Sequence, residues 1–134
     1  MAVLIDTGVL IGLERGSGGE TLERLAGSED RAISVITVSE LLHGVLRARG
    51  GRRAKRRAFV EHVLAGVQPI AITDQVARVH AEVWAQMAAR GNVIGAHDLW
   101  IAATAIAHGF GVVTGNANDF GRVPGLRVIA IPAG

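Results

Sequence analysis

The stretch VLIDTGVLI, residues 3–11, contains the pattern that decides the fold. Its apolar start ends at Asp6 and is followed by the small residues Thr7 and Gly8. Brief apolar runs that end in turn or cap residues are typical of strands buried on both faces. The same pattern recurs in three later segments, 32–36, 111–114 and 126–131. The chain is therefore expected to build its core around a sheet.

Apolar residues between these runs recur at helical spacing. The spacing predicts a helical hairpin at about 37–67 that divides at Gly50 and Gly51, a helix from about Thr73 to Gly91, and a helix from Asp98 to His108. Strands that alternate with helices indicate an α/β fold. We expect a mostly parallel central sheet of four or five strands, flanked by helices on both faces.

Composition narrows the class of protein. The chain has 134 residues, of which 49% are hydrophobic and 19% charged, so we expect a single domain, 1–134, with a substantial core. Because there is no cysteine, metal binding would depend on carboxylate, imidazole and carbonyl groups. No apolar run approaches the roughly 20 residues that span a bilayer, and the start of the chain lacks a signal-peptide pattern. We expect a cytoplasmic protein with no membrane association.

Four carboxylates lie at the ends of the expected segments: Asp6, Glu40, Asp98 and Asp119. Each position has a structural explanation. Asp6 suits a helix N-cap, and Glu40 follows Thr37 at the spacing of a capping box. Asp98 would favour the positive end of a helix dipole, and Asp119 suits a turn. These explanations stay open for each residue taken alone.

The expected topology brings the same acids together. Asp6, Glu40 and Asp119 each follow a strand, and Asp98 opens a helix. Ligands of open α/β sheets gather outside the carboxyl ends of the strands, where the strand order reverses. We therefore expect one acidic pocket. Neighbouring carboxylates disfavour each other's ionisation, and a divalent cation removes that repulsion.

Oxygen ligands indicate Mg²⁺ or Mn²⁺, held by a few carboxylates together with phosphate oxygens of a substrate. Such a cation activates water and neutralises charge, which predicts cleavage of phosphodiester bonds. Ser34 and Ser39 lack a nucleophile elbow, and the five histidines do not fall at zinc spacing. His80 suits the core or an interface. His97 adjoins Asp98 and can orient a ligand or a substrate.

Basic residues are concentrated in one short stretch: Arg47, Arg49, Arg52, Arg53, Lys55, Arg56 and Arg57. The formal net charge of +2 says little about partners, but this distribution is uneven. A solvated connection between two helices explains such a run as well as a surface for an anionic polymer does. Both interpretations stay open at this point.

Together these segments resemble the PIN-domain endoribonucleases, and among them the toxins of VapBC-type toxin-antitoxin systems. The resemblance covers the whole chain. It is carried by VLIDTGVLI (3–11), ISVITVSELLHGV (33–45), HDLWIAATAIAHG (97–109) and VVTGNANDFGRVPGLRVI (112–129). It implies cleavage of single-stranded or structured RNA that depends on Mg²⁺ or Mn²⁺ and inhibits translation. It also implies a homodimer and a cognate antitoxin that inserts a segment near the acidic site.

The resemblance assigns roles to individual residues. Asp6, Glu40 and Asp98 match the principal metal-binding acids of the family. The last family motif often carries its acid a few positions earlier, where this chain has Asn116. Asp119 would therefore contact the metal directly, through water, or not at all.

The resemblance also implies supporting residues around the acids. Thr114 and Asn116 would orient the carboxylates or the attacking water, and Thr7 would add a hydroxyl at the first acid. The basic hairpin would help form the substrate groove and the antitoxin surface, with phosphate contacts that provide affinity but no sequence choice.

Two alternatives use the same features. A non-catalytic RNA-binding module would use the acids only as helix caps, and a metal-dependent DNase or phosphatase would use the same acidic pocket. Only 4% of the residues are aromatic and none is tyrosine, so an extended base-stacking platform is not expected. Recognition of RNA by its shape or through a few loop contacts is the expectation.

Overall fold

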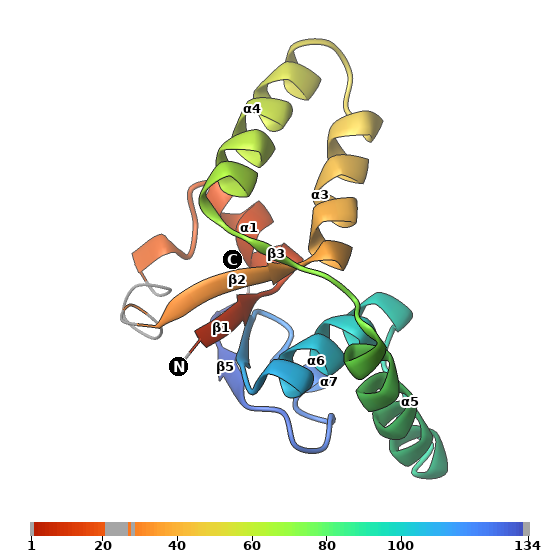
Figure 1. Ribbon diagram of the computed structural model, residues 1–134. Coiled ribbons are helices and arrows are strands. Elements are labelled where there is room, and N and C mark those ends of the chain that lie inside the picture. Colours follow the sequence, from red (N-terminus) through yellow and green to blue (C-terminus); the bar gives the residue numbers. More distant parts are fainter. Residues whose placement is uncertain (1, 21–26, 28, 133–134) are drawn as a thin grey trace.

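A computed structural model describes residues 2–20, 27 and 29–132 of the protein (Figure 1). Strands and helices alternate along the chain as an α/β fold requires. In chain order the elements are β1 (Ala2–Ile5), α1 (Thr7–Glu14), β2 (Asp30–Ser34), α3 (Val35–Arg47), α4 (Gly50–Gly66), β3 (Pro69–Ile70), α5 (Asp74–Ala89), α6 (Ala96–His108), β4 (Gly111–Thr114), α7 (Ala117–Phe120) and β5 (Val128–Ala130).

The sheet has five strands in the order β3-β2-β1-β4-β5, and every pair of neighbours is parallel. The expected parallel sheet is therefore confirmed. Strand order reverses at β1, which pairs with β2 on one side and with β4 on the other. Ile5 and Val113 are register partners, so the ends of β1 and β4 lie side by side at the reversal. Ligands of open α/β sheets bind at such a position.

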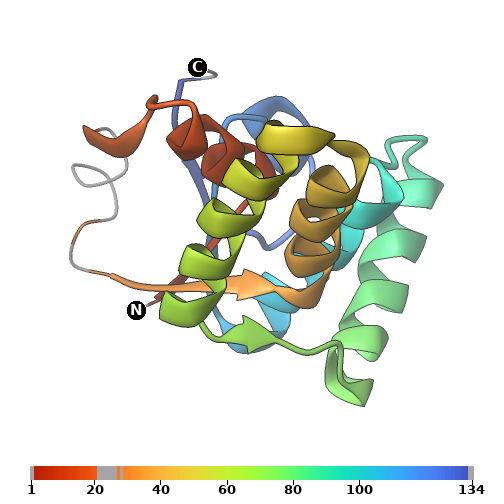
Figure 2. The same ribbon diagram turned by 90° about the horizontal axis from the view of Figure 1, so that it is seen from above.

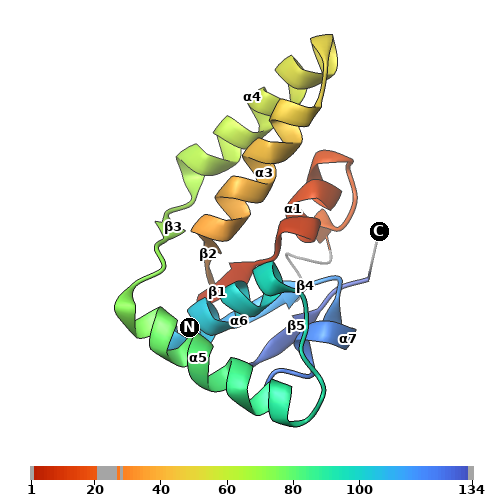
Figure 3. The ribbon, with the colours of Figure 1, turned by 90° about the vertical axis from the view of Figure 1, so that its right-hand side faces the viewer.

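Side chains of β1 alternate between two cores, because successive residues of a strand point to opposite faces of the sheet. Val3 and Ile5 pack with the apolar residues of α1, α3 and α4. Leu4 packs with those of α5, α6 and α7. Helices therefore cover both faces of the sheet, as the sequence predicts, and Figures 1 and 3 show the two layers.

Helices α3 and α4 form the predicted hairpin and lie side by side (Figure 2); the hairpin projects beyond the sheet (Figures 1 and 3). The break lies at Ala48 and Arg49, directly before the predicted glycine pair, which begins α4. Gly50 has a φ of +55°, a conformation that glycine adopts at little cost. The Arg53 guanidinium donates to the carbonyls of Ala48 and Leu46 at 2.7 and 2.8 Å, and so closes the end of α3.

The predicted capping box of Thr37 and Glu40 is wrong. Ser34 caps α3, because its side chain accepts a hydrogen bond of 3.0 Å from the amide of Ile36. Helix α3 thus begins at Val35, and the strand predicted at 32–36 ends at Ser34. Thr37 is the third residue of α3 and not its N-cap, and the Glu40 carboxylate contacts Thr7 and His97 instead.

Helices α5 and α6 follow the predicted spacing closely. Thr73 caps α5 by accepting a hydrogen bond from the amide of Val76. His80 of α5 is buried, as expected, and its ring stacks on Trp100 of α6 at a centroid distance of 3.5 Å. Burial lowers the pKa of His80. None of the helices in the described ranges combines the length and the apolar character needed to cross a membrane.

Candidate active site

Asp6 lies directly after β1 and is buried. Although it occupies the N-cap position of α1, its side chain makes no capping hydrogen bond. Its Oδ2 instead accepts a hydrogen bond of 2.8 Å from the hydroxyl of Thr114, at the end of β4. Burial raises the pKa of Asp6, while the Thr114 hydroxyl and the backbone amide of Thr7 oppose that rise and the Glu40 carboxylate adds to it. Helix capping therefore does not explain the orientation of the Asp6 carboxylate.

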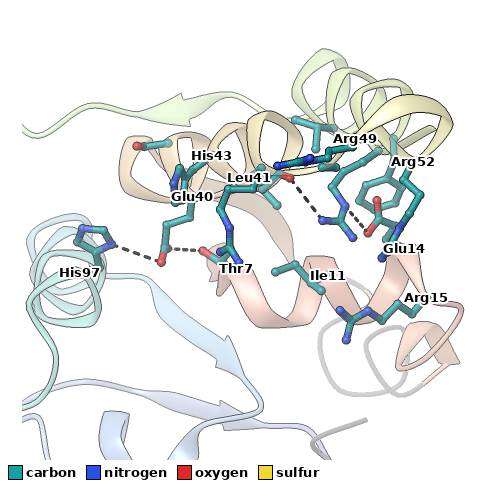
Figure 4. A pocket seen from close by; sticks show the side chains of 17 residues that line it. Thr7, Ile11, Glu14, Arg15, Glu40, Leu41, His43, Arg49, Arg52 and His97 are labelled. Carbon is teal, nitrogen blue, oxygen red and sulfur yellow. Dashed lines mark hydrogen bonds and ion pairs between the residues drawn. The ribbon is translucent and has the colours of Figure 1, made fainter. Parts of the chain in front are cut away.

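Glu40 projects from α3 toward the same strand ends and is held from two sides (Figure 4). Its Oε1 accepts a hydrogen bond of 2.7 Å from Thr7, and its Oε2 lies 3.4 Å from Nδ1 of His97. The Thr7 hydroxyl is also 3.0 Å from that of buried Thr37. Because a carboxylate only accepts, Thr7 gives its proton to Glu40 and receives that of Thr37. Thr7 thus supports Glu40, and not the first acid as predicted.

Asp98 lies in the first turn of α6, where the helix dipole favours negative charge. Its pKa is nevertheless raised to about 6, first by burial and then by the carboxylates of Asp6, Glu40 and Asp119, with His97 acting the opposite way. Carboxylates raise each other's pKa only when they lie close together. The four acids predicted from separate segments therefore face one region.

Asp119 and Asn116 lie together in the segment after β4. The Asn116 side chain donates a hydrogen bond of 3.1 Å to Oδ2 of Asp119, and its backbone amide donates one of 2.8 Å to the Thr114 hydroxyl. Arg122 pairs with the other Asp119 oxygen at 3.6 Å. Asn116 thus connects Asp119 to the Thr114 hydroxyl that holds Asp6. Thr114 and Asn116 are therefore in positions where they can orient these two acids.

The acids are gathered but do not form a closed coordination shell. Within residues 2–20, 27 and 29–132, no three Asp, Glu or His side chains are arranged closely enough to hold a metal ion as they stand. Glu40 contacts Thr7 and His97, and Asp119 contacts Asn116 and Arg122. The donor set consists of the oxygen ligands that hard cations prefer, and the acids would have to come closer together when they bind an ion.

A groove with a volume of about 800 Å³ leads away from the acids between α1, α3 and α4 (Figure 4). Thr7, Glu40 and His97 line its acidic end. Apolar side chains line part of it: Ile11, Leu41, Phe59 and Val60. Five arginines line the groove further along, together with Glu14: Arg15, Arg47, Arg49, Arg52 and Arg56. A groove with a negative end and a positive, partly apolar remainder can accept an anionic chain.

The predicted basic residues divide into three groups. Arg47, Arg49 and Arg52 line the groove and make no ion pair or side-chain hydrogen bond within the described part of the chain. Arg56 also lines it but is engaged by Glu14 at 3.4 Å, and Arg53 closes α3. Lys55 and Arg57 are exposed residues of α4 that do not line the groove.

One groove arginine was not predicted from the sequence. Arg15 comes from the end of α1 and faces the arginines of α3 and α4 across the groove (Figure 4). Arg15 is far from the basic stretch in the sequence, so its place in the groove could not be predicted. It follows only from the packing of α1 against the hairpin. His97, in contrast, adjoins Asp98 in the sequence and proves to contact Glu40.

Comparison with known proteins agrees with this architecture. The PIN domain family matches residues 3–126. The chain is 37% identical to "Ribonuclease VapC1" of Rickettsia felis over 136 residues, which cover 98% of this chain and 97% of that protein. It is 36% identical over 128 residues to "Ribonuclease VapC4" of Mycobacterium tuberculosis, with 96% and 95% of the two chains covered.

A solved structure agrees as well. The crystal structure of VapBC2 from Rickettsia felis, bound to a DNA fragment from its promoter, contains a chain that superposes with a TM-score of 0.87 at 25% identity and covers 98% of this chain and 99% of that one. The parallel sheet, the acids at its strand ends and these similarities define the class as a PIN-domain nuclease. The chain belongs to the PIN-domain family, in its VapC branch.

Proposed function

We propose that this chain is an endoribonuclease that depends on a divalent cation. The observation that carries the proposal is the convergence of four carboxylates: burial, and then the carboxylates of Asp6, Glu40 and Asp119, raise the pKa of Asp98 to about 6. Isolated helix caps do not explain this, because Asp6 does not cap α1 and Glu40 does not cap α3. Ribonuclease names among the relatives support the same reaction class.

The donor set suits Mg²⁺ or Mn²⁺, with Asp6, Glu40, Asp98 and Asp119 as the residues that would hold the ion. A cation bound there supplies activated water and neutralises charge on the phosphate. The protein's own part is orientation. Thr114 fixes Asp6 and Thr7 fixes Glu40, so that their carboxylates lose little freedom when they engage the ion.

RNA would approach the acids along the arginine-lined groove. Phosphate contacts from Arg15, Arg47, Arg49 and Arg52 provide affinity that weakens with salt, and they do not select a sequence. A smaller hollow of about 280 Å³ lies beyond Asp6, between α1 and the turn at Gly115 and Asn116. A polynucleotide that crosses the acids would therefore have space on both sides of the cleaved bond.

We also infer a cognate antitoxin for this chain, because a similar chain occurs in a VapBC complex. Its inhibitory segment would occupy the same groove, whose apolar patches suit a protein segment and whose arginines suit acidic side chains. Such a toxin would act on RNA in the cytoplasm and inhibit translation. The homodimer implied by the resemblance stays a prediction, and sedimentation velocity of the purified chain tests it.

A cleavage assay separates this proposal from its alternatives. Single-stranded and structured RNAs, and DNA oligonucleotides of the same sequences, are incubated with wild type and with Asp98→Asn, in Mn²⁺ or in EDTA. Asp74→Asn is the matched control, because Asp74 also opens a helix but its side chain is 81% exposed and paired with Arg78. We expect cleavage of RNA by wild type and Asp74→Asn, and loss of cleavage with Asp98→Asn or EDTA.

Each alternative predicts a different pattern. A non-catalytic RNA-binding module would bind RNA without cleaving it, and binding would not respond to EDTA. A DNase would prefer the DNA oligonucleotides, and a phosphatase would remove terminal phosphates without shortening the chain. RNA cleavage that is equal in wild type and Asp98→Asn would reject the acidic site. In cells, wild type expressed alone should arrest growth and Asp98→Asn should not.

A further inference from the structure

We propose that the hollow beyond Asp6 is a nucleobase subsite, which receives the base of one nucleotide next to the cleaved bond. This hollow has a volume of about 280 Å³ and lies between α1 and the turn at Gly115 and Asn116. The inference rests on the proposed ribonuclease function and deepens it, because the groove arginines account only for contacts with phosphates.

The position of the hollow places it on the path of the RNA. Helix α1 separates it from the groove. One face of α1 lines the groove (Figure 4): Thr7, Ile11, Glu14 and Arg15. Another face lines the hollow: Gly8, Val9 and Gly12. Glu40 lines the groove and Asp6 lines the hollow, so a polynucleotide that lies in the groove and passes these acids reaches the hollow next.

The sheet topology supports a ligand at this place. The residues that directly follow β1, β4 and β5 all line the hollow: Asp6, Gly115 and Ile131. The hollow therefore lies outside the carboxyl ends of three parallel strands, beside the point where strand order reverses at β1. Ligands of open α/β sheets bind in that position.

The charge of the hollow identifies which part of a nucleotide it suits. Five arginines line the groove, whereas none of the described residues that line the hollow is basic. Asp6 is the charged side chain among them, and a negative charge without a neighbouring cation repels phosphate. The other walls are uncharged, with apolar and hydroxyl or amide groups, and such walls suit an uncharged ring. The groove therefore suits phosphates and the hollow suits a base.

The shape of the hollow suits one planar ring system. Gly8, Gly12 and Gly18 contribute only backbone to its walls, and glycine permits the close approach of a ligand to the backbone. A Cβ added at Gly8 would meet no atom within 4 Å, so this wall faces open space. Ligand pockets begin at roughly 300 Å³. A hollow of about 280 Å³ is therefore large enough for a single base and too small for a longer segment.

Two side chains of the hollow can hold a base that has entered it. The Ser17 hydroxyl donates its proton to the carbonyl of Gly12 at 3.1 Å, so the lone pairs of its oxygen stay available as acceptors. Every RNA base presents N–H groups on the edges that proteins read in single strands. Pro132 is exposed and adds an apolar ring to the wall. These contacts would hold a base without strict choice of its identity.

The test removes one base at a time. The substrate is an RNA oligonucleotide cleaved at one site, in which each nucleotide near that site is replaced in turn by an abasic ribose. An abasic ribose keeps the sugar and the phosphates but lacks the base. For wild type, kcat/KM should fall about tenfold at one position, from the loss of a hydrogen bond and of apolar contacts. If no position is sensitive, the proposal is overturned.

Gly8→Leu fills the hollow from α1. Gly8 is a helical residue whose φ is not positive, and the space around its added Cβ is open, so the variant should fold, which thermal melts check. Its kcat/KM on unmodified RNA should fall about tenfold, with no further loss from the abasic ribose at the sensitive position. If the two losses multiply independently, or if Gly8→Leu cleaves unmodified RNA as fast as wild type, the hollow does not hold the base.

Gly66→Leu is the matched control. Gly66 ends α4, a Cβ added there also meets no atom within 4 Å, and the residue lines neither the groove nor the hollow. This variant should respond to both RNAs as wild type does. If Gly8→Leu does not fold, Ser17→Ala decides, because it removes the acceptor without filling the hollow. It should slow cleavage of unmodified RNA about three- to tenfold and leave cleavage of the abasic RNA unchanged. Equal effects on both RNAs would overturn the proposal.

Failure of the ribonuclease function itself looks different. Wild type would then cleave none of the RNAs, or Asp98→Asn would cleave them as fast as wild type. The comparison is made only on an RNA that wild type cleaves and Asp98→Asn does not. A wild type that cleaves this RNA with no sensitive base would reject the subsite and leave the ribonuclease assignment standing.

Discussion

The hydroxyl of Thr114 donates a hydrogen bond of 2.8 Å to Oδ2 of Asp6, although 108 residues separate them in the chain. Both side chains are buried where β1 and β4 end side by side. Thr114 in turn accepts from the amide of Asn116. The bond therefore connects the first acid of the site to the segment that carries the last, and it opposes the rise that burial causes in the pKa of Asp6.

Thr114→Val tests the importance of this bond. Valine has a similar shape but leaves the Asp6 carboxylate and the Asn116 amide without their partner. We expect the free energy of unfolding to fall by about 1–3 kcal/mol and RNA cleavage to fall about 10- to 100-fold. Thr114→Ser, which keeps the hydroxyl, should retain most of both. Urea unfolding and cleavage rates measure the two effects, and a valine variant that equals wild type in both would refute the role.

Thr7→Val removes the hydroxyl that holds Glu40 and accepts from Thr37. Because Glu40 keeps only its longer contact with His97, we expect cleavage to slow by about tenfold, the effect of one hydrogen bond to a charged group. The measurement is the cleavage rate at saturating RNA. Thr7→Ser is the control and should restore the rate. If serine and valine variants are equally slow, the defect lies in packing and not in the hydrogen bond.

Asp98 makes stability depend on pH in a defined direction. Its pKa is about 6 in the folded protein against an ordinary value of 3.8, so the folded state binds more protons between those values. The contribution of Asp98 to stability therefore decreases as the pH rises from about 4 to about 6. Without a cation, Asp98→Asn should have a higher Tm than wild type at neutral pH, and this advantage should shrink as the pH falls through that window.

Thermal melts in EDTA across this pH range measure the difference between wild type and Asp98→Asn. Added Mg²⁺ should raise the Tm of wild type at neutral pH and have much less effect on the variant. A difference in Tm that stays constant from neutral pH to about pH 4 would contradict the assigned repulsion.

The groove arginines can be tested against a matched residue on the same hairpin. Arg47→Ala, Arg49→Ala and Arg52→Ala should each weaken RNA binding and reduce the slope of log Kd against log salt by about one. Arg57→Ala removes the same charge outside the groove and should change the slope less. Binding isotherms of the Asp98→Asn protein over a range of salt concentrations provide the slopes. Equal slopes for Arg57→Ala and the groove variants would contradict the proposed path of the RNA.

Arg53→Ala should have a different effect, because Arg53 binds the carbonyls of Ala48 and Leu46. We expect it to lower the free energy of unfolding by about 1 kcal/mol. Its slope of log Kd against log salt should be closer to that of wild type than the slopes of the groove variants are. Urea unfolding measures the first effect. An Arg53→Ala variant with wild-type stability and a reduced slope would assign Arg53 to the groove instead.

Local sequence patterns predicted most of the fold. The buried strand 111–114 and the helix capped by Thr73 have strong periodic signals and clear ends. The strand Pro69–Ile70 has only two residues and is too short to show a period. The start of α3 was misplaced because Ser34 and Thr37 are both good caps, and only tertiary packing shows which one is used.

The site was predictable as a set of positions but not as a set of contacts. Asp6, Glu40 and Asp98 follow from strand ends, a helix start and the family pattern. Their partners lie on other elements: Thr7 serves Glu40 from α1, and Arg15 joins the basic stretch from the far side of the groove. Spacing along the chain does not encode such pairings, which depend on how the hairpin packs against α1.

The central claim is that acids from four segments act together on one cation, and it can be measured without knowing the RNA target. Mn²⁺ is titrated by calorimetry into wild type, Asp98→Asn and the control Asp74→Asn. We predict that wild type and Asp74→Asn bind Mn²⁺ with similar affinity, and that Asp98→Asn binds it at least about tenfold more weakly. Equal affinity of wild type and Asp98→Asn, or no binding by wild type, would contradict the account.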